Sequence, residues 1–401
     1  MIRCRKILQI MNQQCHFLQR RMVHHFADSS QWGATSQKDV HMGLGVSVYP
    51  ERVDVDAIVQ YLGRAGTLGY SRVFSCLLSA EGGRAHVVER FSPVARAAHE
   101  ASMALTLDVS PVVFERLGIS PDDLSFFCDL GANAIRLDEA FTPREVAALT
   151  HNPYGLAVEL NASTADGTVA AVCACEPDRS RLSACHNFYP QRYTGLSASF
   201  MEQESRAAKE LGLGVAAFVS SGQPDACGPW PLKEGLPTVE AHRNAPIDLQ
   251  ARHLFATGVV DDVLVSNCFA SDDELRSLAA LDPATVALRV VPAKGAEGPL
   301  FNALLGSSLR VRGDSSPYML RDSDQRARLA PLGIAPHNTW GLVPGDVAVV
   351  NDRGGRYAGE LQVVLKAMDN DGTKNVVANV VEEERFLLGY LGPWSGFSLL
   401  A

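Results

Sequence analysis

The chain lacks several features that would assign it to a specialised class of protein. Its 401 residues contain no stretch near the ~18 uninterrupted apolar residues of a membrane-spanning helix, so no membrane protein is expected. Nine cysteines occur without a C-x-x-C pair, which favours reduced thiols over a zinc ribbon or a disulfide framework. The net charge of −9 argues against non-specific nucleic-acid binding. With 46% hydrophobic and 20% charged residues, the composition is that of a globular protein.

Histidine patterns typical of metal sites are missing as well. The sequence contains neither an H-x-H nor an H-E-x-x-H spacing, although His186, His242, Glu159 and Asp138 are residue types that bind metals. We therefore expect hydrogen-bonding histidines, no metal site and no cofactor.

The first 27 residues hold five basic residues and no acidic one. Such a start suits an organellar transit segment. The alternative is a start site set too early, because Met42 directly precedes the first strand-like run. Residues 1–41 are expected to be a disordered extension or a mis-set start, and they are excluded from the fold prediction.

From residue 43 to about residue 281, eight strand-like runs alternate with helical stretches. This alternation predicts an α/β fold with a parallel sheet closed as a (β/α)8 barrel. A doubly wound open sheet is the alternative, but it calls for a phosphate-binding glycine fingerprint that Ser47–Glu51 does not provide. The expected strands are Leu44–Val48, Arg72–Cys76, Ala104–Val109, Ala134–Asp138, Leu156–Asn161, Leu182–Phe188, Gly214–Val219 and Asp262–Ser266.

The pattern changes near Pro283, where a linker-like stretch, Pro292–Pro299, precedes short strands separated by turns. These strands are expected at Ser308–Arg312, Asp346–Val350, Glu360–Leu365 and Val376–Val381. The sequence thus predicts a catalytic barrel over residues 42–282 and a smaller, mostly-β domain over residues 283–401.

Strand alternation predicts acidic side chains inside the barrel. Apolar residues such as Leu105 and Leu107 suit the helix-facing side, so the alternate residues face the axis. Four strands then direct a carboxylate toward one mouth, where barrel enzymes place their chemistry. Burying several acids without a task is costly, although a neutralising ion network is the alternative for any single residue. The inward set is Glu51, Asp108, Arg136, Asp138, Glu159 and Asn161.

Two segments beyond the sixth and seventh strands carry further candidate binding residues. Aromatic rings stack on sugars, and arginine side chains bind anions, so these segments suit a sugar or phosphate ligand. A long excursion within a compact barrel is also usually functional. The candidates are His186, Asn187, Tyr189, Arg192 and Tyr193 in the first segment, and Glu240, His242 and Arg243 in the second.

A series of motifs, in this order along the chain, resembles one known family, the 6-phospho-N-acetylmuramidases. The likeness covers essentially Met42 to Ala401, and its longest motif surrounds His186. The motifs are Gly45–Glu51, Cys76–Ser79, Asp108–Pro111, Ile135–Glu139, His151–Gly155, Glu159–Ser163, Cys185–Leu196, Glu234–Glu240, His253–Gly258, Arg356–Gln362 and Gly392–Trp394. The chain departs from the family pattern at Ala140, Pro317 and Asp322.

This resemblance implies a (β/α)8 barrel followed by a cyclophilin-like β-barrel domain. It also implies a cytoplasmic glycosidase of peptidoglycan recycling that cleaves the β-1,4 bond of N-acetylmuramic acid 6-phosphate–N-acetylglucosamine. Two other functions remain open: a metal-dependent phosphosugar lyase or epimerase, and a carbohydrate-binding protein without activity. The second domain is expected either to close over the barrel mouth or to form a homodimer.

A glycosidase needs one carboxyl group as general acid and a second as nucleophile or base. Asp138 and Glu159, on neighbouring strands, are the predicted central pair, and Asp108 and Glu51 are the next candidates. The candidates for the 6-phosphate are Arg192, Arg243, Arg321 and Arg136.

Overall fold

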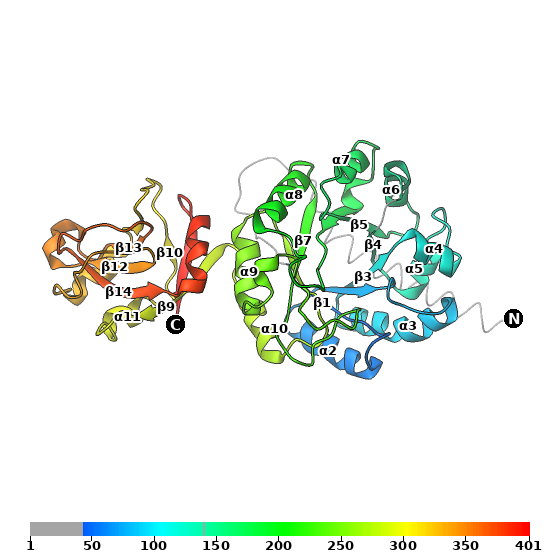
Figure 1. Ribbon diagram of the computed structural model, residues 1–401, viewed down its shortest axis with the longest axis horizontal. Helices are drawn as coiled ribbons and strands as arrows, with labels where there is room; N and C mark the ends of the chain where they lie inside the picture. Colours follow the sequence, from blue (N-terminus) through cyan, green and yellow to red (C-terminus); the bar gives the residue numbers. More distant parts are fainter. Residues whose placement is uncertain (1–42, 139–140) are drawn as a thin grey trace. The chain divides into compact units, whose positions relative to one another are not determined.

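The computed structural model describes residues 43–138 and 141–401, so the predictions for residues 1–41 and the departure at Ala140 lie outside it. Among the described residues, eight parallel strands follow one another in sequence order, and the last pairs with the first (Figure 1). This closed barrel confirms the predicted fold class. Its strands are β1 (Gly43–Ser47), β2 (Arg72–Cys76), β3 (Ala104–Val109), β4 (Ala134–Leu137), β5 (Ala157–Asn161), β6 (Leu182–Cys185), β7 (Gly214–Val219) and β8 (Asp262–Val265).

Helices follow the strands and form the outer layer of the barrel (Figure 1). Local sequence sets several of their starts. The Asp54 carboxylate accepts a hydrogen bond from the Asp56 main chain before α2, and Ser271 with Glu274 forms a capping box before α10. The helices are α2 (Val55–Thr67), α3 (Arg84–Glu100), α4 (Pro111–Leu117), α5 (Ser125–Leu130), α6 (Pro143–Thr150), α7 (Thr168–Cys173), α8 (Ala198–Glu210), α9 (Ile247–Ala256) and α10 (Asp272–Ala279).

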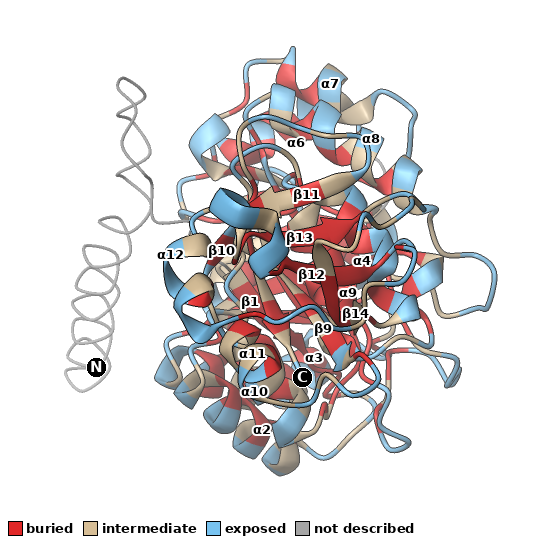
Figure 2. Cartoon of the chain, turned by 90° about the vertical axis from the view of Figure 1, so that its left-hand side faces the viewer, coloured by how far each residue is buried: buried red, intermediate tan, exposed pale blue. Residues whose placement is uncertain are grey.

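Apolar residues fill the space between strands and helices, as the strand alternation predicts. Leu105, Leu107 and Ile135 are fully buried there. Inside the barrel, space is tight at Gly45, where a Cβ atom would lie 2.8 Å from Leu264 and 3.0 Å from Arg72. Figure 2 shows buried residues along strands such as β12 and β13, while exposed residues lie on helices such as α8.

The C-terminal domain is built on a seven-stranded sheet in the order β10-β15-β9-β14-β12-β13-β11. All pairs are antiparallel except β15 with β9. The Arg312 main-chain N–H donates to the Arg321 carbonyl at 2.9 Å, so the two edges of the sheet approach and the barrel nearly closes. The strands are β9 (Thr285–Pro292), β10 (Leu309–Arg310), β11 (Met319–Asp322), β12 (Asp346–Val350), β13 (Leu361–Val364), β14 (Lys374–Val380) and β15 (Gly396–Leu400).

Short helices complete this domain: α11 (Pro299–Leu304), α12 (Arg326–Leu329) and the 3-10 segments Ala330–Leu332, Asp352–Tyr357 and Glu382–Tyr390. The mostly-β prediction is confirmed, but β9, β11 and β15 were not predicted as strands. The inner strand β9 begins just after the predicted domain boundary and pairs with β14 and β15 from much later in the chain, so its local sequence did not indicate its place in the sheet.

Candidate active site

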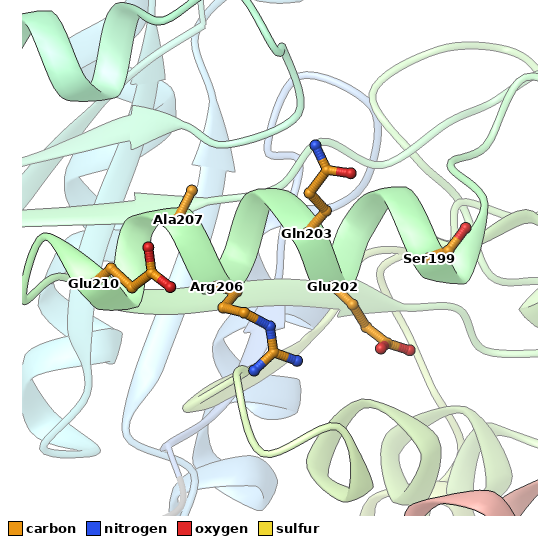
Figure 3. A pocket seen from close by; sticks show the side chains of 6 residues that line it. All are labelled: Ser199, Glu202, Gln203, Arg206, Ala207 and Glu210. Carbon is orange, nitrogen blue, oxygen red and sulfur yellow. The ribbon is translucent and has the colours of Figure 1, made fainter.

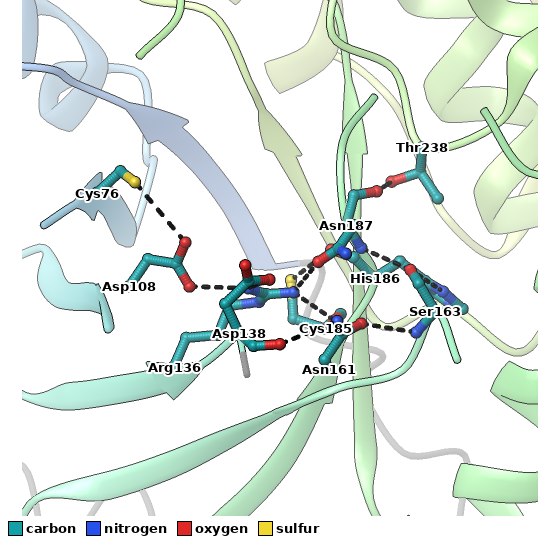
Figure 4. A network of polar contacts seen from close by, with 10 residues as sticks. All are labelled: Cys76, Asp108, Arg136, Asp138, Asn161, Ser163, Cys185, His186, Asn187 and Thr238. Atoms are coloured by element: carbon teal, nitrogen blue, oxygen red, sulfur yellow. Dashed lines mark hydrogen bonds and ion pairs between the residues drawn. The ribbon is translucent and has the colours of Figure 1, made fainter. Parts of the chain in front are cut away.

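Arg136, in β4, joins two of the predicted acids. Its Nη1 donates to Asp108 Oδ1 at 2.7 Å and to Asp138 Oδ1 at 3.1 Å, and its Nη2 donates to the Asn187 side-chain oxygen (Figure 4). The Arg136 and Asp108 side chains are buried, whereas the Asp138 side chain is 29% exposed. The structure therefore gathers three predicted site residues around one guanidinium, and Asp138 is the acid among them that reaches solvent.

Asp108 lies in an environment that opposes its ionisation. Burial raises the pKa of Asp108 to about 6, the negative charge of Asp138 adds to the rise, and the Arg136 guanidinium opposes it. The Cys76 thiol, at the end of β2, lies 3.8 Å from Asp108 Oδ2, and burial raises the pKa of this thiol to about 12. A carboxyl group that titrates near neutral pH suits proton transfer.

A hydrogen-bonded chain runs from Asp138 along the neighbouring strand ends (Figure 4). The Asn161 side chain accepts the Ser163 main-chain N–H at 2.8 Å and donates to the Asp138 carbonyl at 3.5 Å. Ser163 Oγ in turn accepts the Asn187 main-chain N–H at 2.7 Å. These bonds fix Asn161 and Asn187 at the mouth on the side of Asp138.

His186 lies behind this series of hydrogen-bonded residues and does not reach the surface of the mouth. Its Nδ1 is 3.3 Å from Ser163 Oγ, and its Nε2 is 2.8 Å from Ser205 Oγ on α8. The ring is fully buried, and burial lowers the pKa of His186 to about 3. These contacts let a neutral His186 position Ser163, and through it Asn187, without reaching a ligand.

Glu159, predicted to pair with Asp138, belongs to a second ion group. Its Oε2 accepts a hydrogen bond from Arg72 Nη2 at 2.6 Å, and Arg72 Nη1 binds Asp262 at 2.5 Å. Because β2 and β5 are not neighbours in the sheet, the Arg72–Glu159 contact crosses the barrel interior. Glu159 faces inward as predicted, but it is 1% exposed.

Three aromatic rings cross the interior between the two ion groups on the β2 side. Phe74 lies 5.2 Å from Phe218 and 6.0 Å from Phe188, measured between ring centroids. Along β2, Phe74 stands between Arg72 and Cys76. Arg72 and Cys76 were not among the predicted site residues, although the strand alternation that turns Asp108 inward from β3 also turns both of them inward from β2.

Glu51 lies apart from the Arg136 group. Its Oε2 is 3.1 Å from His86 Nε2 on α3. Among the hydrogen bonds of residues 43–138 and 141–401, none joins Glu51 to Arg136, Asp108 or Asp138. The carboxylate at the end of the first strand is thus directed toward a helix that follows the second.

Arg243 and Glu240 hold two mouth loops together. Arg243 binds both Glu240 oxygens, at 2.7 and 2.6 Å, and donates to the Tyr189 carbonyl at 3.0 Å. The Glu240 carboxylate also accepts the main-chain N–H groups of Tyr193 and Gly195, each at 2.8 Å. A Cβ atom at position 195 would lie 2.7 Å from Glu240 Oε2, so this contact requires glycine. The Arg243 guanidinium is thus already hydrogen-bonded to groups of the protein.

Arg192 and Tyr193 are the predicted binding residues that face solvent. Arg192 pairs with Glu234 from the opposite loop, and both side chains are about half exposed. Tyr193 is 88% exposed, and its backbone has a positive φ of 67°, a value that residues other than glycine rarely adopt. This pair remains accessible to a ligand above the mouth.

The last two predicted residues lie elsewhere. His242 Nε2 is 2.7 Å from His253 Nδ1 of α9, and burial lowers the pKa of His242 to about 3. Arg321, in β11 of the C-terminal domain, donates to Asp314 at 2.7 Å. Their contacts give His242 a role in packing α9 and give Arg321 one in holding the segment between β10 and β11.

A separate hollow of about 410 Å³ lies on one face of α8 (Figure 3). It is lined by Ser199, Glu202, Gln203, Arg206, Ala207 and Glu210, none of which is a predicted site residue. Within the described ranges, no three His, Cys, Asp or Glu side chains are grouped to hold a metal ion. In the same ranges no helix has the length and apolarity needed to cross a membrane.

Comparison with known proteins identifies the family. A sequence model of the N-terminal part of 6-phospho-N-acetylmuramidases matches residues 44–280, and a model of their C-terminal part matches residues 286–400. The chain belongs to the 6-phospho-N-acetylmuramidase family. Members of this family are glycosidases that act on a phosphorylated muramic acid sugar in peptidoglycan recycling, so the predicted family and enzyme class are confirmed.

Two solved structures are similar to this chain over most of its length. An uncharacterized Bacillus cereus protein is 37% identical, with a TM-score of 0.81, over 90% of this chain and 99% of its own. A conserved Enterococcus faecalis protein of unknown function is 28% identical, with a TM-score of 0.67, over 90% of this chain and 96% of its own. Among curated protein sequences, none matches the chain.

Proposed function

We propose that Asp108 and Asp138 are the two carboxyl groups with which this muramidase cleaves the β-1,4 bond of N-acetylmuramic acid 6-phosphate–N-acetylglucosamine. The observation that carries this proposal is their shared contact with Arg136 Nη1, at 2.7 and 3.1 Å. Glycosidases need two such groups on either side of the scissile bond. The Arg72–Glu159 contact makes Glu159 a support of the barrel interior in this proposal.

The two acids receive different roles. Asp108, with its pKa raised to about 6, donates the proton to the leaving oxygen. Asp138, which is exposed to solvent, faces the anomeric carbon as nucleophile. Because both Oδ1 atoms bind one nitrogen, at 2.7 and 3.1 Å, they lie closer together than the ~6.5–9.5 Å between the carboxyl groups of inverting enzymes. We therefore propose retention of configuration.

The substrate is held by the residues that remain accessible above the mouth. Arg192 binds the 6-phosphate as a planar cation, and Tyr193 stacks on a sugar face. Asn187 and Asn161 donate or accept hydrogen bonds from their fixed positions beside Asp138. We place the reaction in the cytoplasm, where a disaccharide phosphorylated during uptake arrives. Dimerisation through residues 283–401 stays a prediction.

The test is turnover of the phosphodisaccharide, followed by mass analysis of the two released sugars. Asp108→Asn and Asp138→Asn are each expected to lower kcat about 10²–10⁴-fold, the usual loss of an acid–base group. Asp273→Asn on α10, a 97% exposed carboxylate, is the matched control and should leave kcat unchanged. Near-normal turnover by both site variants would remove them from the mechanism.

Product stereochemistry tests the spacing argument separately. Proton NMR during the first minutes of hydrolysis should detect the β-anomer of N-acetylmuramic acid 6-phosphate before mutarotation. A first product of the α-configuration would mean inversion and would contradict the Asp108–Asp138 pair. Equal kcat/KM for phosphorylated and unphosphorylated disaccharide would contradict the role given to Arg192.

A further inference from the structure

Two cysteines meet near the carboxyl ends of the barrel strands, outside the Arg136 group. Cys268 follows β8, and Cys227 lies in the loop after β7. The Cys268 main-chain N–H donates to the Cys227 carbonyl at 2.7 Å, and the Cys227 N–H donates to the Cys268 carbonyl at 3.2 Å. The two residues thus form an isolated antiparallel bridge.

This bridge has the dimensions that a disulfide needs. Residues that exchange both main-chain hydrogen bonds have Cα atoms ~5.5 Å apart and side chains on the same face. Disulfides usually join Cα atoms ~4.4–6.8 Å apart. The two thiols are also hydrogen-bonded to each other. A covalent bond between the sulfur atoms would therefore require little movement of the backbone.

The two thiols differ in reactivity. Cys227 is half-buried, and its hydrogen bond with Cys268, with the positive charges of Lys233 and Arg52, lowers the pKa of Cys227 to about 7. Cys268 is fully buried, and burial raises the pKa of Cys268 well above its ordinary value. An accessible thiolate beside a protected thiol is the usual arrangement of an attacking and a resolving cysteine.

We propose that Cys227 and Cys268 are a redox modification site that forms a reversible disulfide with a hydroperoxide as oxidant. The Cys227 thiolate attacks one peroxide oxygen, the O–O bond breaks, and hydroxide leaves, which gives a sulfenic acid. The Cys268 sulfur then attacks the Cys227 sulfur, the S–O bond breaks, and water leaves with the Cys268 proton. Two thiols lose two electrons, and hydrogen peroxide is reduced to water.

The disulfide affects the barrel mouth through the loop that contains Cys227. That loop continues to Glu234, which pairs with Arg192, and to Glu240, which holds the Tyr193 main chain. On the other side, the Tyr49 main chain bonds the Cys268 thiol, and the Tyr49 hydroxyl binds the Ser266 carbonyl. The bond fixes the loop on β8 and slows entry of the disaccharide. This consequence for turnover rests on the proposed function.

The modification is tested on the full chain without any substrate. After brief treatment with hydrogen peroxide and alkylation of free thiols, peptide mapping should detect one peptide pair joined through Cys227 and Cys268. The joined pair should have lost two hydrogen atoms, and dithiothreitol should separate it. A Cys227 that is alkylated normally, over-oxidised or joined to another cysteine would overturn the proposal, whatever the activity.

Turnover of the phosphodisaccharide tests the consequence. Oxidation should lower kcat/KM about tenfold, as expected when loop opening limits the reaction, and dithiothreitol should restore it. Cys227→Ala and Cys268→Ala should have normal basal activity and no response to peroxide. Cys175→Ala, which removes another half-buried thiol, is the control and should respond like the unmodified chain. A cross-linked enzyme of unchanged kcat/KM would overturn the regulatory part, whereas a reduced chain without activity would overturn the proposed function alone.

Discussion

The barrel interior holds two arginines, the buried Arg136 and the half-buried Arg72, and each of them binds two carboxylates. Arg136 binds Asp108 and Asp138, and Arg72 binds Glu159 and Asp262. Each group joins one arginine to two acids, but Arg136 and Arg72 lie at different heights along their strands. Asp138 directly follows β4, whereas Arg72 and Asp262 are the first residues of β2 and β8.

This difference in height separates chemistry from support. Active sites of such barrels lie at the carboxyl ends of the strands, and the amino ends contribute stability. Phe74 stands between Arg72 and Cys76 on β2 and meets Phe218 across the interior. In the proposed function, the Arg136 group carries the reaction and the Arg72 group holds the barrel closed.

Changing the acid of the lower group should produce the largest contrast. Glu159→Gln should lower the free energy of unfolding by about 3–5 kcal/mol, because Arg72 loses a charged partner inside the barrel. Its kcat/KM in the folded fraction should stay within about tenfold of normal, below the usual loss of an acid–base group. Urea unfolding measures the loss in free energy of unfolding, and turnover of the phosphodisaccharide measures kcat/KM. A stable Glu159→Gln variant as slow as Asp138→Asn would return Glu159 to the catalytic pair.

Conservative changes of the two arginines sharpen the comparison further. Arg136→Lys should lower kcat/KM about 10²-fold, because a lysine cannot hold Asp108, Asp138 and Asn187 in one plane, and small misplacements cost rate. Arg72→Lys should destabilise the chain with little change in kcat/KM. Steady-state kinetics and thermal unfolding of both variants provide the measurement, and equal kinetic losses would contradict the assignment by height.

A smaller effect is expected at the exposed rim. Arg192→Gln should lower kcat/KM for the phosphorylated disaccharide about tenfold, since a hydrogen bond to a charged group contributes about 1.5–3 kcal/mol. The unphosphorylated disaccharide should be turned over at an unchanged rate. Arg206→Gln, at an exposed arginine of α8, is the matched control. An unchanged preference for the phosphate in Arg192→Gln would mean that another cation binds it.

The smallest effect concerns pH. In the proposed mechanism Asp108 donates the proton, and its pKa is raised to about 6, so kcat/KM is expected to fall as pH rises through about 6. The same shift means that the folded chain binds this proton more tightly than the unfolded chain, so stability from Asp108 is lost between about pH 4 and 6 as pH rises. The negative charge of Glu159 also raises the pKa of Asp108. The kcat/KM of Glu159→Gln should therefore fall at a lower pH than that of the unmodified chain. If kcat/KM falls at the same pH in both proteins, the charge of Glu159 does not act on Asp108.

Strand alternation in the sequence was sufficient to turn Asp108, Arg136 and Glu159 inward, because side chains of a strand alternate between two faces. It was not sufficient to pair them. Arg72 meets Glu159 from a strand that is not a neighbour, and this contact depends on closure of the barrel. Similarly, the composition of the mouth loops indicated an anion site, but Arg243 is fully engaged with Glu240 and with main-chain carbonyls.

Local patterns of the chain alone thus determined the (β/α)8 barrel, the family and the inward direction of Asp108, Arg136 and Glu159, since periodicity, caps and motifs are encoded within short segments. Only the tertiary structure decided which carboxylate meets which arginine and which arginine stays exposed to solvent. The same is true of the contact between Cys227 and Cys268. Contacts such as Arg72–Glu159 and Cys227–Cys268 join residues far apart in the chain, and their distances exist only once the sheet has closed.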